Sequence, residues 1–391
     1  MDLLAGYKIV SLNHFLLGPL AAQILADLGA DVVMVESPRG NFQRGWAGGD
    51  IWANGKSVFY LCAHRNKRSI AIDLKSEQGL EIVRSMIAET DVLMENFRPG
   101  VLERMGLGYG DAKAINPALV YASGSGWGST GPYAKKPGQD LLIQAFSGLA
   151  QTTGRERPTP AGASIVDHHG ATVMAASIMA ALLARGRDGK GRHVEVDLLG
   201  VAMDLQVEPL TAYFNGGEGR STRPKADIAG WIYPAPYGIY QASDGFIALS
   251  LGPIKTMAEV FADEQMALYS DRDCWRKSAE VSAAIARNVK LGKVRDIVEA
   301  FDKEGLWAAP VNDFAALKND PQVIHNEMFE DVELSDGTKV TLLRHAATYD
   351  GVRPGTYMPP PELGADTDAI LADLGYDAER ITGLRKAGAI A

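Results

Sequence analysis

One carboxylate stands at the head of the least polar stretch of the chain. Asp167 precedes residues 171–184, which carry no charge and only two polar side chains, Thr172 and Ser177. This stretch predicts a helix that is buried on nearly every side, with Asp167 at its N-terminal end. On the stretch alone, the commoner role for such an acid is a cap that accepts hydrogen bonds from free helix N–H groups. A reactive carboxylate is the alternative, and only residues elsewhere in the chain favour it.

A second group of residues that could do chemistry is basic. Lysines and arginines lie near the ends of the strands predicted in the first part of the chain: Arg39, Arg65, Lys67, Arg68, Lys75, Arg98, Arg104, Lys135 and Lys136. Gathered beside glycine turns at the end of a parallel sheet, such side chains suit a small polyphosphate ligand. Each one taken singly is better explained as a solvated surface charge, and only their clustering favours a phosphate-bearing ligand.

The common motifs of other chemistries are absent from the sequence. It has no Gly-x-Ser-x-Gly, no His-Glu-x-x-His and no Cys-x-x-Cys, and the first strand-to-helix turn lacks Gly-x-Gly-x-x-Gly. The adjacent His168 and His169 would point in different directions on a helix. We therefore predict no metal site and no prosthetic group.

Composition narrows the class of protein further. The 391 residues carry a net charge of −9, which argues against nucleic acid as the main partner. Cys62 and Cys274 are the only cysteines, so we expect no disulfide framework and a cytoplasmic location. The first residues lack a signal-peptide pattern, and the run 171–184 is shorter than a membrane span requires, so no membrane association is expected.

The elements that must position these residues follow an α/β pattern. Strands are predicted at 7–12, 32–36, 69–74, 92–94 and 119–123, alternating with helices at 18–28 and 76–88. Such alternation predicts a mostly parallel sheet whose ligands bind beyond the carboxyl ends of the strands. After a glycine-rich and basic linker at 217–227, a hairpin at 232–240 and 246–251 opens a second domain. The predicted domains are residues 1–215, 216–330 and, returning to the first, 331–391.

Several ordered blocks resemble the class III CoA-transferase family, typified by formyl-CoA and carnitine CoA-transferases. They cover nearly the whole chain, and their combination is more specific than any one of them. The blocks are Asn13-x4-Gly18-Pro19, Leu28-Gly-Ala-Asp-Val-Val-x-Val-Glu36, Arg65-Asn-Lys-Arg-Ser-Ile-Ala-Ile-Asp-Leu-Lys75, Glu95-Asn-Phe-Arg-Pro-Gly100, Gly138-Gln-Asp140, Asp167 and Pro361-Glu-Leu-Gly364.

The resemblance implies a Rossmann-like large domain with a parallel sheet, an inserted smaller α+β domain and an interlocked homodimer. It implies transfer of CoA from an acyl-CoA to a small carboxylic acid, with Asp167 as the nucleophile beside Gln139 and Asp140. The CoA site that it implies comprises Leu17, Gly18, Arg39, Ile72, Asp73, Leu74, Lys75, Asn96, Phe97, Arg98, Arg104, Lys136, Pro137 and Gly138. N–H groups at the start of the Asp167 helix, or in nearby glycine loops, are the expected donors to oxyanions.

The resemblance leaves two other functions open. One is epimerisation of 2-methylacyl-CoA esters, the reaction of another branch of the family; that branch has a histidine where this chain has Gln139. Moving a proton off and back onto carbon needs two titrating groups, and the amide of Gln139 cannot titrate, so we favour transfer. The other is an acyl-CoA-binding protein without activity. Leu17 and the pair Gln139-Asp140 differ from formyl-CoA transferase, so formate or oxalate specificity is not expected, and carnitine-like, dicarboxylic or other organic acids stay open.

Overall fold

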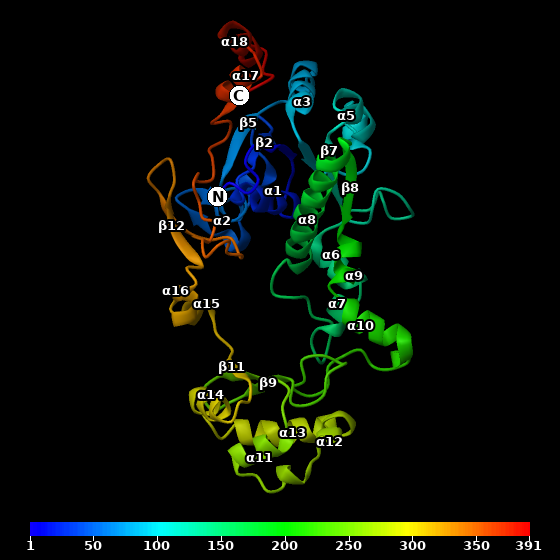
Figure 1. The fold of residues 1–391 in the computed structure, drawn as a ribbon, viewed down its shortest axis with the longest axis vertical. Helices are drawn as coiled ribbons and strands as arrows, with labels where there is room; N and C mark the ends of the chain where they lie inside the picture. Colours follow the sequence, from blue (N-terminus) through cyan, green and yellow to red (C-terminus); the bar gives the residue numbers. More distant parts are fainter. The chain divides into compact units, whose positions relative to one another are not determined.

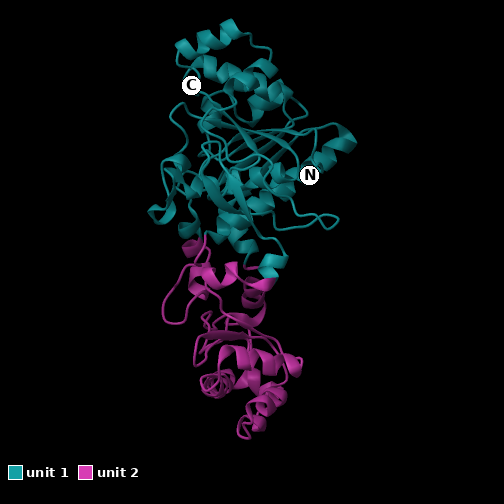
Figure 2. Ribbon diagram, turned by 90° about the vertical axis from the view of Figure 1, so that its left-hand side faces the viewer, with its two compact units in different colours: residues 1–143, 164–205, 322–391 teal, residues 144–163, 206–321 magenta.

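The computed structural model describes all residues, 1–391, in two compact units (Figures 1 and 2). The first unit combines residues 1–143, 164–205 and 322–391, and the second combines residues 144–163 and 206–321. The first unit is therefore assembled from distant parts of the chain. The domain limits proposed from the sequence, after residues 215 and 330, stay a prediction.

A six-stranded parallel sheet forms the centre of the first unit. Its order is β5-β2-β1-β6-β7-β8, which is the 3-2-1-4-5-6 order of doubly wound folds. The strands are β1 (Lys8–Leu12), β2 (Asp31–Glu36), β5 (Lys67–Ala71), β6 (Val92–Glu95), β7 (Val120–Ser125) and β8 (Arg192–Asp197). The predicted α/β fold with a parallel sheet is confirmed. The order reverses between β1 and β6, so the crevice that binds ligands in such folds lies beyond their carboxyl ends.

Helices cover both faces of this sheet (Figure 1). One face of alternate strand residues, such as Val10, Val33 and Leu93, packs in a single core with α3 (Glu77–Glu89), α5 (Tyr109–Ile115), α17 (Thr367–Asp373) and α18 (Ala378–Lys386). The opposite face is covered by α1 (Leu17–Asp27) and α8 (Ile165–Asp188), which also pack against each other. The period-2 alternation thus gives the sheet two buried faces.

Helix α8 departs from the expectation that it is buried on nearly every side. Thr172, Ala176, Ala180 and Leu183 are exposed, and their spacing places them on one stripe of the helix. The opposite stripe, which includes Gly170, is buried. Helix α8 is also the one helix that is long and apolar enough to cross a membrane. The core helix of a folded domain meets the same criteria of length and composition equally well.

The second unit has its own antiparallel sheet and its own core. Strands β9 (Gly238–Gln241) and β10 (Phe246–Leu249) form the predicted hairpin, and β11 (Ala308–Pro310) adds a third strand that was not predicted. Buried side chains from α11 (Ile254–Phe261), α13 (Ser278–Val289) and α14 (Val294–Lys303) pack on this sheet. The unit is therefore of α+β composition.

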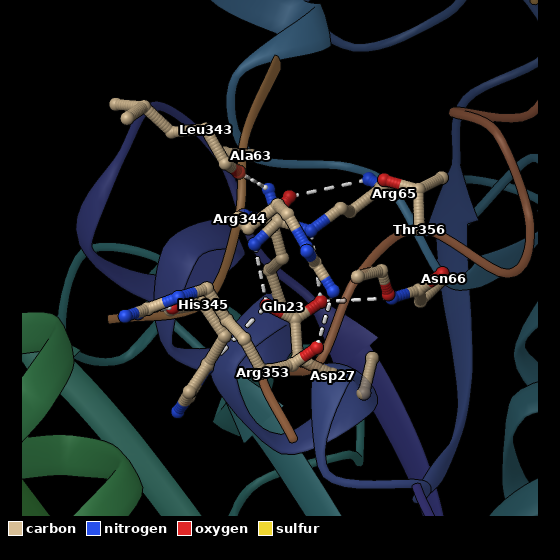
Figure 3. A network of polar contacts seen from close by, with 12 residues as sticks. Gln23, Asp27, Ala63, Arg65, Asn66, Leu343, Arg344, His345, Arg353 and Thr356 are labelled. Carbon is tan, nitrogen blue, oxygen red and sulfur yellow. Dashed lines mark hydrogen bonds and ion pairs between the residues drawn. The ribbon is translucent and has the colours of Figure 1, made fainter. Parts of the chain in front are cut away.

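The end of the chain returns to the first unit through a hairpin, β12 (Phe329–Glu333) and β13 (Lys339–Leu343), which was not predicted. A buried polar network then holds the segment after β13 (Figure 3). Asn66 Oδ1 accepts hydrogen bonds from the N–H groups of Tyr357 and Met358, and Arg65 Nη1 donates to the carbonyl of Leu343. Both side chains also donate to the buried Asp27.

Short elements complete the chain: β3 (Trp52–Ala53), β4 (Lys56–Ser57), α2 (Val58–Leu61), α4 (Val101–Arg104), α6 (Asp140–Phe146), α7 (Leu149–Thr152), α9 (Leu198–Asp204), α10 (Val207–Ala212), α12 (Asp271–Arg276), α15 (Phe314–Lys318) and α16 (Pro321–His325).

Candidate active site

Asp167 lies in the first turn of α8, and the backbone of that helix sits directly on the start of α1. A Cβ atom added to Gly170 would lie 2.7 Å from Cδ1 of Leu17, so a larger residue here would displace the Leu17 side chain. Leu17 is the first residue of α1 and follows the loop that leaves β1. Asp167 therefore lies one helical turn before the contact of α8 with the start of α1.

A different carboxylate caps α8. Asp140 Oδ2 accepts the N–H groups of Val166 at 2.8 Å and of Asp167 at 3.0 Å, while Ser164, at the N-cap position, contributes no side-chain hydrogen bond. The interpretation of Asp167 as the cap is therefore wrong. These two N–H groups are already bonded, so neither is free to donate to an oxyanion.

The Asp167 carboxylate accepts no hydrogen bond and makes no ion pair within the chain. Burial, and secondarily the neighbouring charge of Asp140, raise the pKa of Asp167 from 3.8 to about 7. Both causes disfavour the ionised form. A carboxylate that is desolvated and unpaired is more basic than an ordinary one, and a more basic oxygen is a stronger nucleophile. The geometry therefore favours a reactive role over a structural one.

Glycines bring Asp140 to this place. A Cβ at Gly126, in the loop after β7, would lie 2.5 Å from the Cα of Gly138, so the two backbones are in direct contact. Gly138 is followed by Gln139 and Asp140, which begins α6. Asp140 is 8% exposed, whereas Gln139 is exposed and its carbonyl accepts the N–H of Ile143. Of the two predicted neighbours of Asp167, Asp140 makes a hydrogen bond to it, through the Asp167 N–H.

The crevice at the strand reversal brings three segments together. A Cβ at Gly124, in β7, would lie 3.2 Å from Cβ of Asn96, 3.2 Å from Cδ2 of Leu17 and 3.3 Å from Cε of Met174 in α8. The loop after β1, the loop after β6 and the Asp167 helix therefore meet at one point. No side chain caps α1 there, so the N–H groups of Leu17 and Gly18 have no side-chain acceptor; both residues are buried, and the Asn13 side chain lies against Gly18.

The basic side chains predicted for the CoA site lie after four strands at the same edge of the sheet. Arg39 follows β2, Lys75 follows β5, Arg98 and Arg104 follow β6, and Lys136 follows β7, and all five are exposed. Lys136 Nζ lies 3.8 Å from the centre of the Tyr133 ring. The neighbouring Pro137 carbonyl accepts a hydrogen bond from Trp127 Nε1.

The remaining residues of the predicted CoA site frame this edge. Ile72 is fully buried and bridges Ile390, and the N–H of Asp73 donates to the carbonyl of Ala389, so the C-terminus supports this loop. Leu74 packs partly on the core, and the Phe97 ring meets the His14 ring. The side chain of Ile72 cannot reach a ligand, although its backbone lies at the edge. The assignment of these residues to CoA stays a prediction.

Three of the nine basic residues do not belong to this edge. Arg65, Lys67 and Arg68 lie before or at the start of β5, which places them at the amino end of the sheet. Arg65 pairs with Asp27 and Arg68 with Asp31, and the buried Lys67 donates to the carbonyls of Pro19 and Ala63. Burial lowers the pKa of Lys67 to about 7. Their inclusion among ligand residues is therefore wrong.

Comparison with known proteins gives one family. A sequence model of the family described as CoA-transferase family III matches residues 4–367. The chain is 31% identical to succinate–glutarate CoA-transferase of Agrobacterium fabrum, covering 95% of each protein, and 30% identical to human succinyl-CoA:glutarate CoA-transferase, covering 99% of this chain and 90% of the human protein. A crystal structure of a CAIB/BAIF family protein from Brucella suis matches with a TM-score of 0.83 and 31% identity, over 95% of this chain and 98% of that one.

Proposed function

The chain belongs to the class III CoA-transferase family, an enzyme family that moves CoA from an acyl-CoA thioester to a carboxylic acid, and on this premise we propose that Asp167 carries the transfer covalently. The observation that supports this role is the state of its carboxylate, which is desolvated, unpaired and raised in pKa to about 7 at the head of α8. Gln139 and Asp140 assist it in this proposal. Asp140 holds the first turn of α8, and Gln139 offers an amide to the reacting carboxylates.

The proposed reaction needs no net proton transfer. A carboxylate oxygen of Asp167 attacks the thioester carbonyl of the donor, and the C–S bond breaks. CoA leaves as a thiolate, and the donor acyl group stays joined to Asp167 as a mixed anhydride. The thiolate then attacks the aspartyl carbonyl, the anhydride C–O bond breaks, and the donor acid leaves as its carboxylate. The resulting aspartyl-CoA thioester reacts with the acceptor acid by the same two steps in reverse order, which frees Asp167 and forms the new acyl-CoA.

Each tetrahedral intermediate carries an oxyanion that needs hydrogen-bond donors. The N–H groups of Leu17 and Gly18 at the uncapped start of α1 are the donors that we assign to it, because those of Val166 and Asp167 are taken by Asp140. The exposed basic residues after β2, β5, β6 and β7 would hold the phosphates of CoA. In this proposal CoA is a substrate, and no prosthetic group takes part.

The acceptor that we propose is a small carboxylic acid. The names of the relatives support this class, because they specify succinate, glutarate and, in an enzyme of Acetobacter aceti, oxalate. A screen of acyl-CoA donors against a panel of acids, read by mass spectrometry, would identify the acid that this chain accepts.

A trapping experiment tests the covalent step. Enzyme incubated with an acyl-CoA donor and then treated with hydroxylamine or borohydride should carry the modification on the peptide that contains Asp167, located by mass spectrometry. The opposite outcome is also defined. If Asp167 stays unmodified while the α-hydrogen of the acyl-CoA exchanges with deuterated water at a rate that supports turnover, the chain is an epimerase.

The proposal extends to assembly and location. Exposed apolar side chains support a homodimer: Leu183 on α8 is 69% exposed, and in the second unit Trp307 is 72% and Phe314 91% exposed. In sequence, residues 206–321 lie between two parts of the first unit, which supports an inserted smaller domain. The family resemblance favours a dimer in which the two chains interlock. The free thiols of Cys62 and Cys274 are compatible with a cytoplasmic location.

Sedimentation velocity tests the assembly. The full-length chain should sediment as a dimer at micromolar concentration, and Leu183→Glu should weaken that dimer, because the new charge would have to lose its water in a buried contact. A stable monomer of the unmodified chain would contradict the dimer.

A further inference from the structure

A side-chain amide joins the two strands at the point where the strand order reverses. Strands β1 and β6 are parallel neighbours, and the last residues that they pair are Leu12 and Glu95. Just beyond, Asn96 Nδ2 donates to the carbonyl of His14 at 2.7 Å, and the N–H of His14 donates to Asn96 Oδ1 at 2.8 Å. We propose that Asn96 is a positioning residue for the transfer, a staple that sets the distance between the loop before α1 and the loop after β6.

The chemistry of this staple requires an amide. Where a parallel ladder ends, the next backbone N–H and C=O are left without strand partners, and unsatisfied backbone groups are costly. The Asn96 amide offers one donor and one acceptor in a single plane, so one side chain satisfies both backbone groups of His14 beyond the end of the ladder. A carboxylate would lose the donor, and an alanine would lose both bonds.

A contact chain links the staple to the reacting group. Cβ of Asn96 and Cδ2 of Leu17 press on the same face of Gly124, and Leu17 in turn touches Gly170, three residues after Asp167. On the other side, the His14 ring meets Phe97 edge-on with ring centres 4.9 Å apart. If the staple opened, the loop before α1 would be free to shift, and the Leu17 and Gly18 N–H groups would move relative to Asp167.

This role differs from a direct contact with CoA, and it rests on the proposed function. The side-chain polar atoms of Asn96 are engaged with the main chain of His14. We therefore assign the CoA contacts of the loop after β6 to the backbone of that loop and to the Arg98 side chain. The two roles predict different kinetics. Loss of a CoA contact raises the Kd for CoA, whereas loss of positioning lowers kcat and leaves the Kd nearly unchanged.

The experiment compares Asn96→Ala and Asn96→Asp with a matched control, Asn116→Ala. Asn116 is a similar staple at the amino edge of the same sheet: Nδ2 donates to the carbonyls of Ile87 and Thr90, and Oδ1 accepts the N–H of Ala118. We expect both alanine variants to melt at similarly lowered temperatures. Only Asn96→Ala should lose kcat, on the order of 10²-fold, as misplaced catalytic groups do, with the Kd for CoA near the wild-type value. Asn96→Asp should not restore kcat, because it lacks the donor.

Several results would overturn the inference. They are a wild-type kcat in Asn96→Ala or Asn96→Asp, an equal loss of kcat in Asn116→Ala, or a raised Kd for CoA with kcat unchanged at saturation. Failure of the proposed function can be told apart from these results on the variants, because it would be seen in the wild-type enzyme itself. A wild-type chain that transfers no CoA and labels no Asp167 removes the proposed function and the staple's role with it.

Discussion

Asp167→Asn should lower CoA transfer by roughly 10⁴-fold or more, the loss that follows removal of a covalent nucleophile. The substitution keeps the size and shape of the side chain and leaves the cap on α8 in place, since Asp140 Oδ2 accepts the backbone N–H groups of Val166 and Asp167. An amide oxygen is a far weaker nucleophile than a desolvated carboxylate and cannot form the aspartyl thioester. The measurement is the initial rate of acyl-CoA formation, with the Kd for CoA measured in parallel and expected to be unchanged.

Asp140→Asn is the matched control for this experiment. Its amide oxygen can still accept the N–H groups of Val166 and Asp167, so the first turn of α8 should persist. It removes the charge that contributes to the raised pKa of Asp167, so a moderate loss of rate and a shift of the pH profile to lower pH are expected. Full activity of Asp167→Asn would exclude the covalent mechanism, whatever the control shows.

The wild type and Asp167→Asn should differ in how their free energy of unfolding depends on pH. The pKa of Asp167 is about 7 in the folded chain and near the ordinary 3.8 when unfolded, so the unfolded chain releases its proton first. Stability of the wild type should therefore fall as pH rises from about 4 to about 7. A gap of about three pKa units, at about 1.36 kcal/mol per unit, sets an upper limit of about 4 kcal/mol. Asp167→Asn lacks this slope, which urea unfolding at pH 5 and pH 8 would reveal.

Hydrophobic runs and turn residues were enough to predict the centre of this fold. Five of the six strands of the parallel sheet were anticipated from short apolar runs, as buried parallel strands have, although β5 begins with Lys67 and Arg68, which precede the predicted run. Strand β8 was not, because Arg192, His193, Glu195 and Asp197 interrupt its apolar residues. It lies at the sheet edge beside β7 alone, where alternate residues reach water.

The failures at the site share one physical cause, which is that local sequence does not specify distant partners. The cap on α8 comes from Asp140, 26 residues before Val166. The sequence near the helix start does not show this distant partner, and Asp167 is the acid that it offers as a cap. Arg65 and Arg68 lie close to a strand as Lys75 does, but at its opposite end, and their partners Asp27 and Asp31 decide their role. The exposed stripe of α8 could not be predicted. The helix is apolar on every side, so no polar face shows which side the rest of the chain leaves exposed.

The network around Asp27 should be the most sensitive point of the first unit (Figure 3). Asp27 is 2% exposed, and its carboxylate accepts hydrogen bonds from Arg65 Nε at 2.9 Å and Nη2 at 2.5 Å and from Asn66 Nδ2 at 2.8 Å. His345 Nδ1 lies 3.5 Å from the same carboxylate. Through Arg65 and Asn66 this one group connects α1 to the segment that returns from β13.

Asp27→Ala should therefore lower the free energy of unfolding by about 3–5 kcal/mol, because it leaves the buried Arg65 guanidinium without its counter-charge. Asp31→Ala is the matched control. Asp31 also makes a two-point ion pair, with Arg68, but its side chain is 42% exposed, and exposed pairs contribute at most about 1 kcal/mol. Urea unfolding measures both variants. Equal losses would show that the Asp27 network does not hold the returning segment, whereas recovery in Asp27→Ala with Arg65→Met would show that the unpaired charge, and not a missing contact, causes the loss.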